Sequence, residues 1–239
     1  MKQIEVAAYL KGIPLFSTLD DEKCMVLADK ATQTSKKAGQ TLIREGDTLT
    51  KVFIFMEGGG VLYFLQPDGK KTVVQHIRPN KAFPVETALM GSRQSGNIEV
   101  VQDAMILGIP VDLVLELMRT DAAFACQVAR HSMDLALRLT DLLKDLSFNA
   151  TARLGRYLFR RALEASSTYG EGVTFDLGLR KGVLADYLGI TPATLSRMFN
   201  QLQGEGVISI KGSTVIVRSV RDLVRLSEGF YCPSQGADY

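Results

Sequence analysis

The stretch "VLADYLGITPATLSRMFNQLQGEGVISI", residues 183–210, holds two helix-like segments separated by a break at Gly189, and an apolar β-like run follows them. Gly189 can adopt the left-handed backbone conformation that ends a helix and turns the chain sharply. Thr191 is a good N-cap for the second helix, and Pro192 stands at the first helical position, where its missing N–H costs nothing. These signals predict two helices joined by a tight turn.

The second of these helices has two different faces. We expect one face to be buried through Leu195, Met198, Phe199 and Leu202. The other presents short polar side chains, one arginine and the segment's N-terminal turn: Pro192, Ala193, Thr194, Ser196, Arg197 and Asn200. This pattern is typical of a helix-turn-helix, whose second helix enters a major groove about 12 Å wide with its N-terminal residues at the base edges. The alternative is an ordinary αα-corner in an accessory domain of an enzyme.

The exposed residues suit DNA chemically. Arg197 can donate two hydrogen bonds to guanine O6 and N7, and the short hydroxyl side chains can donate to phosphates or bases. The segment "VISIKGSTVIV", residues 207–217, predicts a two-stranded wing that turns at Lys211–Gly212. Lys211 and Arg180 are candidate phosphate contacts. The predicted DNA-binding residues are Thr191, Pro192, Ala193, Thr194, Ser196, Arg197, Arg180 and Lys211.

Composition places the chain among folded proteins. Its 239 residues suit one large or two small domains, and its 46% hydrophobic and 23% charged residues exclude a disordered chain. No apolar run approaches the ~20 residues of a membrane helix, and the first residues lack the apolar core of a signal peptide, so we expect a cytoplasmic protein without a membrane partner. Residues 150–239 carry 11 Lys and Arg against 8 Asp and Glu, which permits nucleic-acid binding there. Cys24, Cys126 and Cys232 are too far apart for a disulfide framework or a CxxC metal site.

The N-terminal half changes from helical to strand patterns. Residues 5–31 hold two short helical patterns, and residues 40–110 hold β-branched or aromatic runs separated by glycine-rich turns, which predicts antiparallel strands in a sandwich or barrel. "QPDGK", residues 66–70, is a hairpin signal. We expect residues 58–60, "GGG", to form a tight turn; a phosphate cradle is the alternative, but no helix or Lys-Ser/Thr follows.

Residues 111–146 are predicted to be helical, with Asp121 capping the second segment. Within it a 3/4 spacing runs through Ala125, Val128, Ser132, Leu135, Leu139, Leu142 and Leu146. This regular spacing favours a narrow coiled-coil seam over a broad core face, so we predict a parallel homodimer through the last six of these residues. A helix packed on its own domain is the alternative. Asn149 or Ser147 should cap the next helix, residues 150–165.

These segments together resemble the CRP/FNR family of bacterial transcription regulators over nearly the whole chain. "GIPLFSTLDDEKCMVLADKA" resembles the family's N-terminal helices, "AGQTLIREGD" the opening of its cyclic-nucleotide-binding-type β-roll, and "FNATARLGRYLF" the hinge and first helix of its DNA-binding domain. "LADYLGITPATLSRMFNQLQGEGVI" is the most specific match. The resemblance implies an α+β fold: an effector-sensing β-roll domain over 1–110, a dimerisation helix and hinge over 111–148, a winged helix-turn-helix over 149–232 and a tail over 233–239.

The resemblance implies an effector-gated homodimer that binds a palindromic operator in double-stranded DNA and recruits or blocks RNA polymerase. An enzyme is not expected, because the sequence shows no Ser/His/Asp arrangement, P-loop or HExxH. The alternatives are a cyclic-nucleotide-responsive regulator of the same fold and a ligand-binding module without DNA function. Family members often carry Glu where this chain has Ala193, and alanine cannot accept a hydrogen bond from cytosine N4. Readout should therefore fall on Ser196 and Arg197.

The effector is the least defined part. "FPVETALMGSRQSGNIEV", residues 83–100, matches the phosphate-binding cassette of cyclic-AMP-binding relatives, but Val85 replaces its Gly, "RQSG" replaces "PRxA", and Arg93 is out of register. A buried phosphate without its Arg leaves charge unpaired, so cyclic nucleotide is disfavoured. The predicted effector pocket consists of Phe83, Val85, Glu86, Arg93 and Leu139.

Two other sensing chemistries occur among such regulators. Oxygen-sensing relatives carry an N-terminal cysteine cluster, whereas this chain has only Cys24 there, so no iron–sulfur cluster is expected. The pattern is most similar to the branch that responds to nitric oxide or nitrosative stress, which includes dissimilatory nitrate respiration and hybrid-cluster-protein regulators and for which haem is the proposed cofactor. His76 and His131 are the candidate axial ligands, since haem iron takes His, Met or Cys. A small metabolite, or no ligand, is the alternative.

Overall fold

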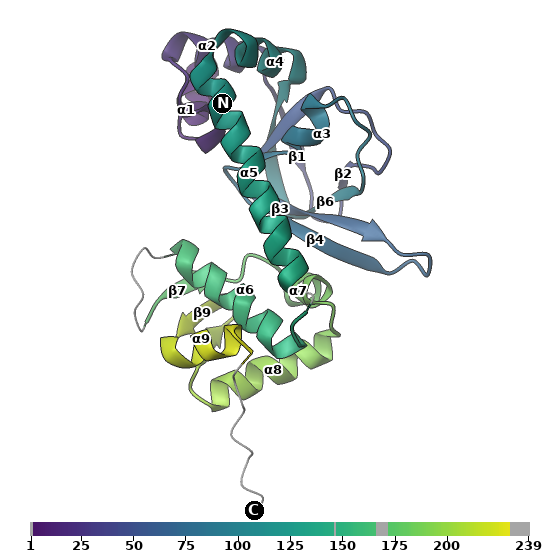
Figure 1. Ribbon diagram of the computed structural model, residues 1–239, viewed down its shortest axis with the longest axis vertical. Coiled ribbons are helices and arrows are strands. Elements are labelled where there is room, and N and C mark those ends of the chain that lie inside the picture. The colour runs from purple at the N-terminus through teal and green to yellow at the C-terminus, as the bar shows by residue number, and fades with distance from the viewer. Residues whose placement is uncertain (1, 146, 166–171, 230–239) are drawn as a thin grey trace, which may run out of the picture. The chain divides into compact units, whose positions relative to one another are not determined.

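The computed structural model describes residues 2–145, 147–165 and 172–229 (Figure 1). Its contacts divide the chain into two compact units, Met1–Leu139 and Thr140–Tyr239. The division falls inside the longest helix, α5 (Ala122–Asp145), rather than at either end of the predicted 111–148 segment. None of the described helices is long and apolar enough to cross a membrane.

The first unit is an antiparallel β-roll with helices. Its strands are β1 (Thr32–Lys36), β2 (Thr41–Ile43), β3 (Lys51–Leu65), β4 (Lys71–Ile77), β5 (Ala82–Phe83) and β6 (Asn97–Pro110). They pair in the order β1-β6-β3-β4, with β2 also on β6 and β5 also on β3. Its helices are α1 (Gln3–Lys11), the 3₁₀ turn η1 (Pro14–Phe16), α2 (Asp21–Lys30), α3 (Val85–Leu89) and α4 (Val111–Thr120). The predicted β-roll is confirmed.

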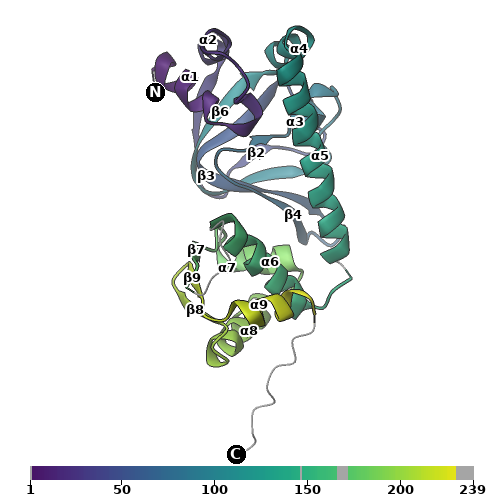
Figure 2. The same ribbon diagram turned by 60° about the vertical axis from the view of Figure 1, so that its left-hand side comes forward.

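Two apolar clusters form the core of this unit. One lies where α1, α2 and α4 gather at one end of the roll (Figures 1 and 2), and there the rings of Phe16 and Phe124 stack with centroids 5.9 Å apart. The other fills the roll around Phe55 and Phe83, whose rings lie 4.9 Å apart. Val128 is only 3% exposed and belongs to the first cluster, so the start of α5 packs on its own domain.

The prediction of a tight turn at residues 58–60 is wrong. These glycines lie inside β3, where the register with β6 shifts on both sides of Gly59. Gly58 has φ 75°, and a Cβ there would lie 2.4 Å from the Asp103 carbonyl oxygen. A Cβ on Gly60 would lie 2.8 Å from the Glu99 carbonyl oxygen. The glycines therefore allow a bulged strand to approach β6 closely, as glycine within a strand commonly does.

The predicted turn and cap signals in this half are confirmed. Gln66 and Lys70 are joined by a backbone hydrogen bond of 2.9 Å across the β3–β4 hairpin. The Asp121 carboxylate accepts the Phe124 N–H at 3.0 Å at the start of α5. At the start of α6 (Ala150–Ala165) it is Asn149 whose side chain accepts a helix N–H, from Ala152 at 2.9 Å.

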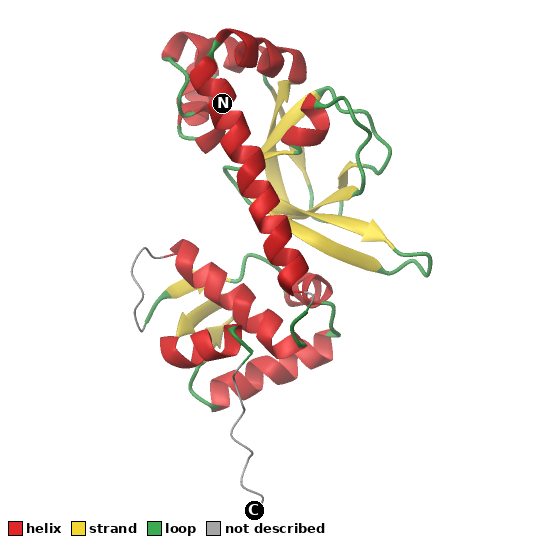
Figure 3. Cartoon of the chain, viewed as in Figure 1, coloured by secondary structure: helices red, strands yellow, loops and turns green. Residues whose placement is uncertain are grey.

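The second unit is helical with one small sheet (Figure 3). After α6 come β7 (Thr174–Asp176), α7 (Lys181–Leu188), α8 (Pro192–Gly204), β8 (Ile208–Lys211), β9 (Thr214–Val217) and α9 (Val220–Ser227). The strands are antiparallel in the order β7-β9-β8, so the predicted two-stranded wing is joined by a third strand. Gly155 lets α6 approach α9 closely, since a Cβ there would lie 2.6 Å from Leu226 Cγ.

Candidate nucleic-acid interface and effector domain

The turn between α7 and α8 has the predicted geometry. Gly189 ends α7 in the left-handed conformation, with φ 65° and ψ 34°. The Thr191 hydroxyl accepts the Thr194 N–H at 3.1 Å, which caps α8, and Pro192 occupies the first turn of the helix. Because a glycine, a cap and a proline all act within four residues, the direction in which α8 leaves the turn is fixed locally.

The two faces of α8 separate largely as predicted. Leu195, Phe199 and Leu202 are at most 2% exposed, whereas Met198 is half-buried because it lies at the edge of the packed face. On the other face Thr194 is half-buried, and the exposed residues are Pro192, Ala193, Ser196, Arg197 and Asn200. The N-terminal half of α8 therefore offers a hydroxyl, from Ser196, and a guanidinium, from Arg197, to solvent.

Hydrogen bonds hold these polar side chains in place. The hydroxyls of Thr191 and Thr194 lie 2.9 Å apart, and Arg197 donates to the Thr194 hydroxyl at 3.4 Å. The guanidinium has five donors, so this single long bond leaves most of them free for a base edge. Arg197 is thus oriented by its own helix before any ligand arrives.

Cations flank the recognition helix. Arg180 is the exposed N-cap residue of α7, and Lys211 is exposed at the end of β8 in the wing. The Lys181 ammonium lies 5.7 Å from the centre of the Phe199 ring, and Arg218 donates to the Ser209 hydroxyl at 3.3 Å. These two cations were missing from the predicted set, although each stands beside a predicted element. Among the described residues, no ion pair engages Arg180, Lys181 or Lys211.

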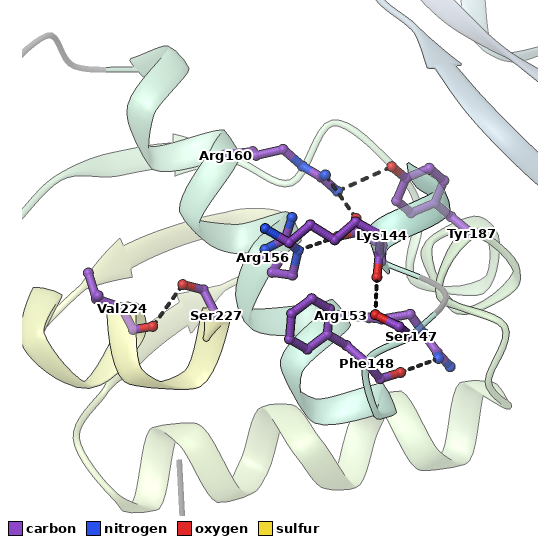
Figure 4. A network of polar contacts seen from close by, with 10 residues as sticks. Lys144, Ser147, Phe148, Arg153, Arg156, Arg160, Tyr187, Val224 and Ser227 are labelled. Carbon is purple, nitrogen blue, oxygen red and sulfur yellow. Dashed lines mark hydrogen bonds and ion pairs between the residues drawn. The ribbon is translucent and has the colours of Figure 1, made fainter. Parts of the chain in front are cut away.

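The end of α5 is bound to α6 by a buried ion network. Asp145, with a side chain only 6% exposed, accepts hydrogen bonds from Arg156 and from Arg160, the latter at 2.9 Å. Arg160 also reaches the Tyr187 hydroxyl on α7 at 3.4 Å, and Arg153 donates to the Leu188 carbonyl at 3.1 Å. Figure 4 shows these arginines, all of them on α6. The last turn of α5, α6 and the helix-turn-helix therefore form one connected unit.

The predicted effector-pocket residues do not come together. Phe83 and Val85 are buried in the two different apolar clusters. Arg93 is exposed and donates to the Gly46 carbonyl at 3.1 Å, and Leu139 is 48% exposed. Only Glu86 remains of this set as a polar group turned inward: its Oε1 is buried without a hydrogen-bond partner, 3.9 Å from His131 Nε2.

Family comparisons agree with both units. Residues 33–121 match a family model described as a cyclic nucleotide-binding domain, and residues 152–226 match one described as a Crp-like helix-turn-helix domain. The two matches together span more than half of the chain, in the order that the fold shows. The chain belongs to the CRP/FNR family. The helix-turn-helix is accordingly the DNA-binding domain of a CRP/FNR-type transcription regulator, which confirms the coarse functional prediction.

Individual relatives have low sequence identity to this chain but align over most of its length. The "Anaerobic regulatory protein" of Aggregatibacter actinomycetemcomitans is 24% identical over 189 residues, which is 79% of this chain and 73% of the relative. The "Transcriptional activator protein FnrL" of Cereibacter sphaeroides is 27% identical over 217 residues, 87% of this chain and 84% of the relative. Neither name refers to nitric oxide, so the similarity to the nitrosative-stress branch stays a prediction.

Solved structures confirm the CRP/FNR fold. A mutant of CooA from Carboxydothermus hydrogenoformans matches with a TM-score of 0.71 and 20% identity, covering 84% of this chain and 89% of that one. FixK2 from Bradyrhizobium japonicum matches with a TM-score of 0.70 and 19% identity, covering 82% and 96%.

The cassette of this CRP/FNR regulator does not fit a cyclic phosphate. Val85 is fully buried where cyclic-AMP-binding relatives have the glycine that approaches the phosphate. Arg93 points to the Gly46 carbonyl on the surface instead of into the roll. A phosphate placed here would lose water without gaining a charged partner, which is strongly unfavourable.

The surroundings of His131 do not fit a haem either. His131 lines a cavity of about 170 Å³ whose other polar residues are mostly charged, whereas pockets for ligands smaller than haem already measure about 300–1,000 Å³ and are mostly apolar. His76 is half-buried in β4, opposite Val61 of β3. Cys24 is buried, Cys126 is exposed, and Cys232 lies outside the described residues.

Proposed function

We propose that this CRP/FNR regulator is a homodimer that reads a palindromic DNA site with α8 and is gated by a small molecule bound in the first unit. The carrying observation is the exposed face of the N-terminal half of α8, where Ser196 and Arg197 follow a capped turn that Gly189 defines. Arg197 would read guanine, and Arg180, Lys181 and the wing would hold phosphates. Its site of action would be the bacterial cytoplasm, with RNA polymerase as a partner on the promoter.

The exposed apolar side of α5 supports the homodimer. Four large apolar side chains on this helix are exposed: Met133 (65%), Leu137 (69%), Leu139 (48%) and Leu143 (68%). Met133 and Leu137 lie one helical turn apart, and so do Leu139 and Leu143. We call these four side chains the exposed row, and exposed apolar side chains of this size on a soluble helix mark an interaction surface. Of the predicted seam only Leu139 belongs to this row, because Val128 is in the core, Ser132, Leu135 and Leu142 are half-buried, and Leu146 lies outside the described residues. The proposed dimer surface of α5 therefore differs from the seam that the 3/4 spacing predicts.

The test of DNA binding starts from the operator, which is selected from randomised duplexes with the purified full chain. The wild type should bind the selected duplex with an affinity that falls steeply as salt rises. Arg197→Ala should weaken binding to the selected duplex by about 1–3 kcal/mol, which is about 5- to 150-fold in affinity, and should relax the base preference at one base pair. Arg119→Ala removes the same charge from the exposed surface of α4 and is the control. Equal losses in both variants would contradict base readout by Arg197, and the absence of any salt-dependent binding would leave a ligand-binding module without DNA function.

The dimer is tested by measuring the molar mass of the protein by light scattering as it elutes from a size-exclusion column. Leu143→Asp places a charge in the exposed row and should give a monomer. Leu163→Asp is the matched control, because Leu163 is a 38% exposed leucine on a different helix, α6. A dimer that survives Leu143→Asp would contradict the proposed seam.

A further inference from the structure

A cavity in the first unit lies apart from the cassette. It is lined by Ile13–Leu15 around η1, by Asn80–Ala82 in the loop between β4 and β5, and by α5 from Gln127 to Arg138. Its volume is about 170 Å³. Ile13, Leu15 and Ala82 are at most 5% exposed and give it an apolar wall, while α5 and Lys81 supply polar groups.

The cavity carries an excess of positive charge. Lys81, Arg130 and Arg138 line it against a single carboxylate, Asp134, and that carboxylate is already paired with Arg138. Neither the Lys81 nor the Arg130 side chain forms an ion pair or hydrogen bond with any described residue. Two cations that face a cavity without an ion pair of their own attract an anion, and a carboxylate or phosphate satisfies them best.

The surrounding backbone holds these groups in position. The Gln127 amide donates to the Pro14 carbonyl at 2.6 Å, which ties η1 to α5. Asn80 has φ 62°, the single positive φ outside glycine among the described residues, and its side chain accepts the Tyr9 hydroxyl at 2.8 Å. Backbone in this sparsely populated region persists where the surroundings fix it and is often found at ligand sites. Lys81, the next residue, is therefore presented to the cavity by a fixed turn.

His131 connects the cavity to α3. Burial holds the pKa of its imidazole below the usual value, and the charges of Arg138 and Lys81 act in the same direction, while Glu86 and Asp134 oppose them. A neutral imidazole can donate one hydrogen bond and accept one. Its Nε2 lies 3.9 Å from the buried, unpartnered Oε1 of Glu86, so a ligand that contacts His131 acts on the helix that resembles the cassette.

The geometry points to this cavity as the binding site of a small organic anion. Lys81 and Arg130 would hold its carboxylate or phosphate, and its apolar part would rest on Ile13 and Leu15. The inference deepens the proposed function by naming the class of effector; it rests on that function only for the step from anion binding to DNA affinity.

The test measures binding without DNA. Succinate and inorganic phosphate, the two sources of the anionic group, are titrated into the full chain by calorimetry at constant ionic strength. One of them should bind saturably with one site per chain. Lys81→Gln and Arg130→Gln should each weaken that binding about tenfold or more, because each removes a hydrogen bond from a charged donor. Both side chains are exposed, so the variants should fold.

Controls separate this site from general charge and from the DNA-binding function. Lys70→Gln removes an exposed cation from the β3–β4 turn and should leave anion binding unchanged. No saturable binding of either probe, or an equal loss in Lys70→Gln, would overturn the proposal. Arg197→Ala should keep anion binding while losing DNA. Anion binding that leaves the affinity for the selected duplex unchanged would keep the site and refute its role as the effector site.

Discussion

Replacing Asp145 by Asn should destabilise the second unit by about 2–4 kcal/mol. The Asp145 carboxylate is 6% exposed and accepts from both Arg156 and Arg160, whose side chains are 19% and 34% exposed. Removing one partner of a buried ion pair costs about 3–5 kcal/mol, since the remaining charge stays desolvated. Here the partly exposed arginines regain some water, and the amide oxygen of Asn keeps one acceptor, which lowers the expected loss.

Asp134→Asn is the matched control on the same helix. Asp134 also pairs with one arginine, Arg138, but its side chain is 57% exposed. Exposed pairs contribute about 0–1 kcal/mol, so this variant should lose little. Hydrogen exchange read by mass spectrometry resolves the two units: peptides from α6 should lose protection in Asp145→Asn, while peptides from β3 and β6 should not. An Asp145→Asn protein as protected in α6 as Asp134→Asn would refute the reasoning.

Three further results are expected. Gly155→Ala should lower the free energy of unfolding of the second unit, measured in urea, by up to about 2 kcal/mol. The new Cβ would lie 2.9 Å or less from backbone atoms of α9, and this overpacking outweighs the gain in helix propensity. Gly182→Ala is the control: a Cβ there has nothing within 4 Å, so this variant should be stabilised. The hydrogen bond from Lys23 lowers the pKa of the Asp121 carboxyl. The contribution of this carboxylate to stability is therefore complete above the ordinary carboxyl range and is lost as pH falls through the lowered pKa. Asp121→Asn should make stability depend less steeply on pH in acid unfolding followed by circular dichroism. Purified protein given haem should show no stoichiometric Soret band, and a band that shifts with nitric oxide and changes in His131→Ala would instead restore the haem prediction.

The helix-turn-helix could be predicted in detail because its determinants are local. A glycine with a left-handed conformation, a threonine cap and a proline at the first turn act within four residues, Gly189 to Pro192, and each has one favoured structural role. The same holds for the Asp121 and Asn149 caps and for the hairpin at residues 66–70. Where neighbours in the sequence decide the structure, the sequence alone is sufficient.

The errors concern contacts between distant residues. The glycines at 58–60 accommodate the carbonyls of Asp103 and Glu99, some forty residues away, and nothing near them in the sequence indicates that approach. For a related reason the predicted seam of α5 wrongly includes Val128, which lies in the core of the first unit. A leucine at 3/4 spacing can pack either on its own domain or on a partner chain. Only the packing of Phe124 and Val128 shows which side of the helix is buried against the first unit. The proposed anion cavity is lined by three segments that are far apart in the sequence, so no single segment carries a sequence motif that predicts it.

Helix α5 contributes residues to both units, and under the proposed function it would link anion binding to DNA affinity. Its first turns are packed in the first unit through Phe124 and Val128, and its last residue, Asp145, lies in the ion network of the second. A ligand that contacts His131 bears on the middle of the same helix. Allosteric coupling requires an element whose state both sites influence, and under the proposed function α5 would be that element. If the coupling runs through it, Asp145→Asn should keep anion binding and some DNA binding, yet lose the dependence of one on the other.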